Sequence, residues 1–208
     1  MNLSDKWKLR FTRMMQVTLV GLLFSGFYYG SSKIVINSGM GLIISLIPGV
    51  MEKRYNVATD PLLTLWITLA IFLHSLGSLG FYNAISWWDH LTHALSASIV
   101  AGIGYTFIRS VDIHSEEIYL PRKFMFVFLL LTILAFGVVW ELFEYGLDII
   151  ADSTGLVMPL AQHGLEDSMK DMMFNALGAV LTAIFGQVYL SELAEKWAER
   201  HLHLPNKK

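Results

Sequence analysis

The sequence predicts an all-α polytopic membrane protein, a bundle of six transmembrane helices, and three observations support this. Of the 208 residues, 54% are hydrophobic and only 15% are charged, against about a quarter charged in ordinary soluble domains. The mean hydropathy is +0.52. Six apolar stretches reach or approach the length of about 20 residues that a helix needs to cross a hydrocarbon core. We therefore expect a single integral membrane domain over residues 1–208.

The six expected spans follow one another with turn residues between them. The first comes after a basic segment and reads as a retained span that also acts as the export signal, because no convincing small-residue cleavage site follows it. The second is short and carries Asn37 and Ser38. Segments such as "YYGSS" and "EKRYNVATDP" supply the turns. The spans are expected at about 13–30, 34–50, 62–80, 90–108, 124–146 and 170–190.

The basic residues predict the orientation in the membrane. With a cytoplasmic N-terminus, all but Lys33 and Lys170 of the 15 Lys and Arg residues lie on the cytoplasmic side or its flanks. This positive-inside bias favours six spans in a bacterial inner membrane, with both termini cytoplasmic. A five-span arrangement without the second segment would scramble the bias. The tail "LSELAEKWAERHLHL" is expected to be a solvated or membrane-surface helix.

Three of the expected helices carry ionisable residues on one face near their non-cytoplasmic ends. The spacings of three, four and seven residues place the members of each set on the same helix face. Because lone ionisable groups in hydrocarbon are costly, these faces should meet in one pocket, open to the outer side. The residues are Asp89, His90 and His93 on the fourth span, Glu141, Glu144 and Asp148 on the fifth, and Asp167, Asp171 and Asn175 on the sixth.

Structural explanations compete with the pocket. Asp89 could cap its helix, and Asp167 could simply favour a helix N-terminus. Glu141, Asp171 and Asn175 are harder to explain in this way because each lies inside an apolar run. For these three, a hydrogen-bonded network that holds helices together is the alternative to a functional site.

The chemistry of such a pocket requires either protons or a cation, because this many carboxylates cannot all stay ionised in a low dielectric. Oxygen ligands with one or two imidazoles suit Mg²⁺, Mn²⁺, Ca²⁺ or Zn²⁺. The expected metal ligands are Asp89, His93, Glu141, Glu144, Asp167 and Asp171. The expected acid, base or ligand groups in catalysis are Asp89, His93, Glu141 and Asp171. His90, Asp148 and Asn175 are expected to form a polar network around them.

Other chemistry is not indicated by the sequence. The chain has no cysteine, which excludes thiolate nucleophiles and Cys-ligated zinc. No phosphate-cradling glycine loop or dinucleotide fingerprint is present, so no residues are assigned to an organic cofactor, and a divalent metal is the one cofactor that the residues indicate. The lone His74, midway along the third span, is expected to be a satisfied core histidine, with membership of the pocket as the alternative.

Two function classes remain open, with a structural membrane subunit as a third. The first is a metal-dependent enzyme or binder that acts on phosphate-bearing head groups of envelope lipids. The second is a transporter or channel for protons or cations. Apart from scattered Thr and Gln, the cytoplasmic halves of the last three spans are apolar, which favours the first. Membrane lipids are the expected partners, nucleic acid is not, and the oligomeric state is open.

Three segments in order resemble the VanZ-like family of small bacterial membrane proteins: "WWDHLTHALSA", "WELFEYGLD" and "DSMKDMMFNALGAVLTAIFG". Over most of residues 34–186 the likeness is closest to its YjdF branch of inner-membrane proteins. The resemblance implies a multi-pass membrane protein. It points to Asp89, His93, Glu141, Glu144, Asp167, Asp171, Asn175 and Gly178. The chain has Glu144 where the VanZ helix has Gln, and it lacks an Arg that often precedes the aspartates. Both differences argue against carrying over the glycopeptide-resistance role of the name-giving member.

Overall fold

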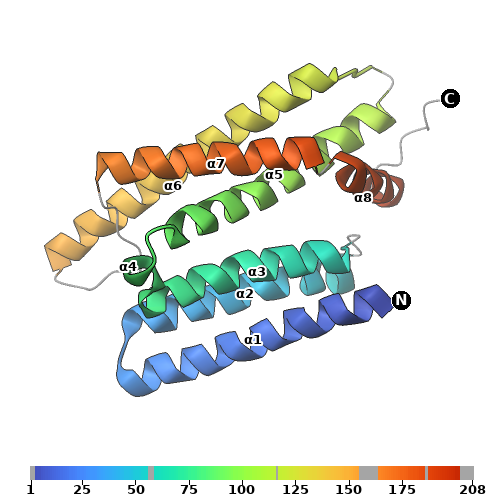
Figure 1. Cartoon of the computed structure of the whole chain (residues 1–208). Coiled ribbons are helices and arrows are strands. Elements are labelled where there is room, and N and C mark those ends of the chain that lie inside the picture. Colours follow the sequence, from blue (N-terminus) through green and yellow to red (C-terminus); the bar gives the residue numbers. More distant parts are fainter. Residues whose placement is uncertain (1–2, 56–58, 116, 155–163, 186, 202–208) are drawn as a thin grey trace.

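The computed structural model describes residues 3–55, 59–115, 117–154, 164–185 and 187–201, and every regular element in these ranges is helical (Figure 1). The all-α prediction is confirmed for this part of the chain. The elements are α1 (Leu3–Tyr29), α2 (Ser32–Tyr55), α3 (Pro61–Leu76), the π-helix η1 (Gly77–Phe81), α4 (Tyr82–Ala84), α5 (Trp88–His114), α6 (Arg122–Thr154), α7 (Leu165–Phe185) and α8 (Gln187–His201).

Four helical stretches are long and apolar enough to cross a membrane: Ser32–Tyr55, Pro61–Ala84, Trp88–His114 and Arg122–Thr154. The number rises to five if the bent pair of Leu165–Phe185 and Tyr189–Glu199 is one span. The predicted spans 34–50, 62–80, 90–108 and 124–146 fall within the four. The first predicted span, 13–30, is not among them, so the six-span count stays a prediction. The last, 170–190, includes residue 186, which lies outside the described residues.

Local sequence signals begin and end several of these helices. Asp60 caps α3, since its carboxylate accepts a hydrogen bond from the Leu62 backbone N–H at 2.7 Å, and proline follows as the first helical residue. Gly30, between α1 and α2, has a φ of 66°, and Gly164, before α7, has a φ of 102°. A residue without a Cβ adopts these values without strain.

The helices form two packed groups that meet along α3 and α5 (Figure 1). In the first group α1, α2 and α3 pack on one another, and in the second α5 packs on α6, α7 and α8. The closest approach joins α5 to α7, because a Cβ added at Gly178 would lie 2.2 Å from the Ala94 carbonyl oxygen. Small residues at such crossings are typical of membrane helix packing. This contact holds the polar face of α7 against the first turns of α5.

The outer faces of the bundle are apolar, as a bilayer requires. Val17 and Phe24 on α1, Leu131 and Leu142 on α6, and Met173 on α7 are each more than 60% exposed. Contiguous apolar exposure on this scale is unusual for a soluble monomer. These faces are suited to contact with lipid chains.

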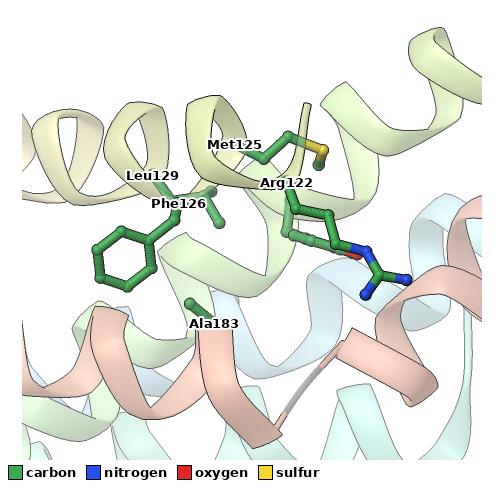
Figure 2. Close-up of a pocket in the computed structure, with 6 residues that line it drawn as sticks. Arg122, Met125, Phe126, Leu129 and Ala183 are labelled. Atoms are coloured by element: carbon green, nitrogen blue, oxygen red, sulfur yellow. The ribbon is translucent and has the colours of Figure 1, made fainter. Parts of the chain in front are cut away.

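A small cleft lies at the start of α6 and the end of α7 (Figure 2). Figure 2 shows Phe126 and Leu129 over Ala183, with Arg122 beside them. Its volume is about 20 Å³, which is room for about one water molecule. The cleft is too small for a substrate and lies at the end of α6 away from the acidic residues.

Candidate metal centre

The first turns of α5 and α7 lie beside the later half of α6 (Figure 1), and the acidic and histidine side chains come together there. Because α6 runs in the opposite direction to its two neighbours, the later half of α6 lies at the same level as the first turns of α5 and α7. Glu141 on α6 and Asp171 on α7 are both buried at this level, with exposed fractions of 8% and 2%. Asp89 and His93, on α5, are half-buried.

One group of ligand atoms consists of Asp89, His90 and Asp171, all within 4.8 Å of one another. His90 Nδ1 lies 3.8 Å from Asp171 Oδ1. The His90 ring is stacked on Phe174, with the ring centroids 4.4 Å apart and the planes at 4°. The stacking fixes the plane of the imidazole and so directs its nitrogen toward α7.

A second group consists of His93, Glu141 and Asp171, again within 4.8 Å of one another. His93 Nε2 lies 3.7 Å from Asp171 Oδ2 and 3.7 Å from Asp89 Oδ1. Asp171 therefore faces both histidines, one through each carboxylate oxygen. It is the residue that the two groups share.

Three buried atoms of the two groups have no hydrogen-bond partner among the described residues: His90 Nδ1, Glu141 Oε1 and Asp171 Oδ1. Buried polar atoms are nearly always paired because the loss of hydration is otherwise uncompensated. The separations of 3.7 and 3.8 Å are too long for hydrogen bonds. They suit two ligands on one ion, since atoms each about 2.1 Å from a metal lie no more than about 4.2 Å apart. The donor set therefore fits a divalent cation.

Four other predicted residues lie outside both groups. Glu144 is buried, but its Oε1 accepts a hydrogen bond from Trp140 Nε1 at 2.9 Å. Asp148 and Asp167 are half-buried. Asn175 is buried one turn beyond Asp171 and lines a neighbouring cavity.

The neighbouring cavity, called here the interhelical cavity, has a volume of about 270 Å³ and lies between α2, α3, α5, α6 and α7. Its polar lining consists of His74, Thr92, His93, Ser96, Trp140 and Asn175. Its apolar lining consists of Met40, Ile44, Ile71, Ala97, Val100, Ile133, Phe136 and Gly137. His93 belongs to both the cavity and the metal-ligand groups, so the two are continuous.

His74, for which the sequence favours a satisfied core position over membership of the pocket, lines this cavity. It does have a partner, since its Nδ1 lies 2.6 Å from the Tyr82 hydroxyl. The π-helix brings Tyr82 back over His74, and a Cβ added at Gly77 would lie 2.2 Å from the Tyr82 ring. The paired glycines of "GSLGFY" in an apolar run are the sequence signal of this irregular turn.

Comparison with known proteins gives a family but no activity. A family model described as "Predicted membrane protein (DUF2238)" matches residues 11–192. A protein of Thermotoga maritima, named "Uncharacterized protein", is 28% identical over 138 residues, which are 65% of this chain and 67% of the relative. No solved structure matches the chain.

Proposed function

The chain belongs to the DUF2238 family of predicted membrane proteins, and we propose that it is a metal-dependent enzyme or binder for phosphate-bearing lipid head groups. It works in a bacterial inner membrane with six spans, α1 being the first, and both termini cytoplasmic. Its partners are membrane lipids and not nucleic acid. The proposal keeps the resemblance of residues 34–186 to the YjdF branch of the VanZ-like family, without that family's resistance role.

The observation that supports a metal is the position of Asp171. This carboxylate is 2% exposed, faces two imidazoles at 3.7 and 3.8 Å, and keeps one oxygen without a hydrogen-bond partner among the described residues. Asp89 and Glu141 add negative charge beside it. A divalent cation would complete the coordination and offset the charge of the clustered acids.

The same cation would explain how a pocket lined with acids could bind a phosphate group. Without it, the carboxylates would repel a phosphate group. With Asp89, His93, Glu141 and Asp171 as ligands, the ion would draw a phosphate oxygen to the site and polarise it. His90, close to Asp171 but held on Phe174, is then available to move a proton.

The test is the metal content of the purified protein, prepared without chelators and measured by elemental mass spectrometry. Wild type should hold about one or two divalent ions per chain, and Asp171→Asn should lose them. Asp152→Asn is the matched control, because Asp152 is an exposed acid on α6, and it should keep the metal. Wild-type protein that contains no divalent metal, and takes none up on addition, would refute the proposal.

Cation or proton transport is the second candidate, and one observation favours it. Ser98, Thr106, Ser110 and His114 are buried on one face of α5, at spacings that are multiples of four. They extend the polar character of the site toward the other end of the bundle. The hydroxyls of Thr106 and Ser110 donate to backbone carbonyls at 2.8 and 2.6 Å, as expected of structural hydroxyls. The transport candidate fails if liposomes with the protein show no ion flux beyond empty liposomes.

A further inference from the structure

The interhelical cavity changes from polar to apolar along the helix axes. On α5 the lining runs from Thr92 and His93 to Val100, a distance of about 10 Å at about 1.5 Å per residue. On α6, which runs the other way, it passes from Trp140 to Ile133. The polar end is the end that joins the metal centre, and the other end offers only hydrocarbon contacts.

The helices α2 and α3 complete the same gradient. His74 lies at the polar end, and Ile71, one turn earlier on α3, lies deeper. The lining residues from α2 are Met40 and Ile44, both apolar. The apolar end of this cavity suits apolar ligands, because it offers a polar group or an ion no partner. An ion path or a small polar substrate would make no use of it.

The cavity has a side opening between α2 and α6. Met40 and Phe136 line it and are also 46% and 58% exposed. These two helices belong to different packed groups and make no extended contact with each other in the described part of the chain. In a bilayer this opening faces lipid chains, because the neighbouring side chains of α2 and α6 are large, apolar and exposed, as for Ile43 and Val139.

We propose that the ligand is a lipid phosphate that enters from the bilayer, with its phosphate bound at the metal centre and a hydrocarbon chain in the interhelical cavity. The inference rests on the proposed function, because the metal is what draws the phosphate to the acids. The cavity adds a requirement that the metal centre alone does not make. A phosphate ester without a chain should bind much more weakly than the same head group with one.

The experiment fills the apolar end of the cavity and compares two probes. Ile44→Trp places a large side chain in the cavity, and Ile43→Trp is its matched control, because Ile43 is 66% exposed on the same helix. The probes are radiolabelled lysophosphatidic acid, which has one acyl chain, and glycerol 3-phosphate, the same head group without the chain. Binding is measured on the full-length protein in a neutral detergent, with Mn²⁺ and with EDTA, and metal content is measured in parallel.

Wild type and Ile43→Trp should bind lysophosphatidic acid at least about tenfold more tightly than glycerol 3-phosphate. Ile44→Trp should lose this preference while its glycerol 3-phosphate affinity and metal content stay at the wild-type level. A second pair, Val100→Phe with Ile103→Phe as its control, fills the same space from α5, since Ile103 is 51% exposed and lies outside the cavity. It should give the same result.

Equal affinities of wild type for the two probes would overturn the inference, because the head group would then bind without help from a chain in the cavity. Undiminished lysophosphatidic acid binding in both cavity-filling variants would overturn it as well. Failure of the proposed function gives a different result: wild type then holds no metal, and neither probe binds more tightly with Mn²⁺ than with EDTA. The same measurements therefore distinguish failure of this inference from failure of the proposed function.

Discussion

The two ends of α5 both place a buried aspartate beside basic side chains, and they differ in how that aspartate is satisfied. At the C-terminal end of α5, called here the far end, Asp112 is 4% exposed. It pairs with the Arg109 guanidinium and accepts a hydrogen bond from the Leu120 backbone N–H at 2.8 Å. At the N-terminal end of α5, called here the near end, Asp171 of α7 faces His90 and His93 at 3.7 to 3.8 Å. One of its oxygens has no hydrogen-bond partner in the described part of the chain.

The difference distinguishes a carboxylate that the protein's own groups satisfy from one that we propose to bind a metal. Asp112 ties the connection between α5 and α6 to the last turns of α5, and Ser110 adds a hydrogen bond to the Ala194 carbonyl oxygen of α8 at 3.0 Å. The Asp112 carboxylate is therefore satisfied by the protein's own groups, whereas Arg109 Nε and His114 Nδ1 at the same end have no hydrogen-bond partner among the described residues. At the near end, in contrast, one buried oxygen of Asp171 has no hydrogen-bond partner among the described residues, and this is the basis of the proposed metal site.

The largest effect is expected from Gly178→Ala, which disturbs the near end and leaves the far end alone. Its Cβ would lie 2.2 Å from the Ala94 backbone oxygen, so α7 must move away from α5. Overpacking of this kind should lower the free energy of unfolding by about 3 kcal/mol, measured by thermal and denaturant unfolding in detergent. The metal content should fall as well.

Gly146→Ala is the control for that variant, because no atom lies within 4 Å of its added Cβ. It should raise the free energy of unfolding by up to about 1 kcal/mol, through the higher helix propensity of alanine. Equal stability of Gly178→Ala and wild type would show that α5 and α7 do not approach as closely as described.

Mn²⁺ should stabilise the protein through the residues of the near end and not through those of the far end. At a free concentration of about one hundred times its Kd, the ion should raise the free energy of unfolding by about 2.7 kcal/mol. Asp171→Asn should abolish this increment, and Asp112→Asn should retain it. Thermal unfolding with Mn²⁺ and with EDTA measures the increment. The distinction between the two ends fails if both variants respond to Mn²⁺ alike.

Asp112→Asn should destabilise the far end whether or not metal is present. Removing one partner of a buried ion pair costs about 3 to 5 kcal/mol, but the Arg109 side chain is 36% exposed, so we expect about 2 kcal/mol here. Arg109→Gln should have a similar effect, and the double variant should show less than the sum of the two. Additive effects in denaturant unfolding would mean that the pair is not coupled.

Asp171→Asn should have the opposite sign in metal-free protein, and it is the smallest effect. Removing one of three clustered acids relieves like-charge repulsion and the cost of burying a charge. We expect a gain in the free energy of unfolding of about 1 kcal/mol in EDTA. A clear loss, of the size expected for Asp112→Asn, would show that Asp171 is a structural acid and that the near end is complete without a ligand.

The near end was largely accessible from the sequence, because helical spacing alone places Asp89 and His93 on one face and Asp171 with Asn175 on another. Their position inside or beside apolar runs then predicts that the faces meet. The sequence could not show which of the predicted acids belong to the metal-ligand groups and which have other partners. Glu144 shares a face with Glu141, yet it pairs with Trp140, because the rotation of α6 against its neighbours decides which acid reaches the centre.

The interhelical cavity could not be predicted at all. Its walls come from five helices in two packed groups, and the distance between those groups depends on side-chain volumes at many crossings. His74 is the clearest example, since its role depends on the π-helix that carries Tyr82 over it. The predicted first span could not be settled either, because a basic residue, Arg13, stands where its apolar run begins.

The contact of Gly178 with Ala94 limits how far the ligands on α5 and α7 can move relative to each other. His93 is the neighbour of Ala94 in the chain, and Asp171 lies two turns before Gly178. With backbones this close, neither helix can adjust to an ion of a different size. Mg²⁺ requires oxygen ligands at about 2.0 to 2.1 Å, and Ca²⁺ requires about 2.3 to 2.6 Å and more of them. If a metal binds as we propose, the absence of a single side chain at residue 178 should make the site discriminate between ions by their radius.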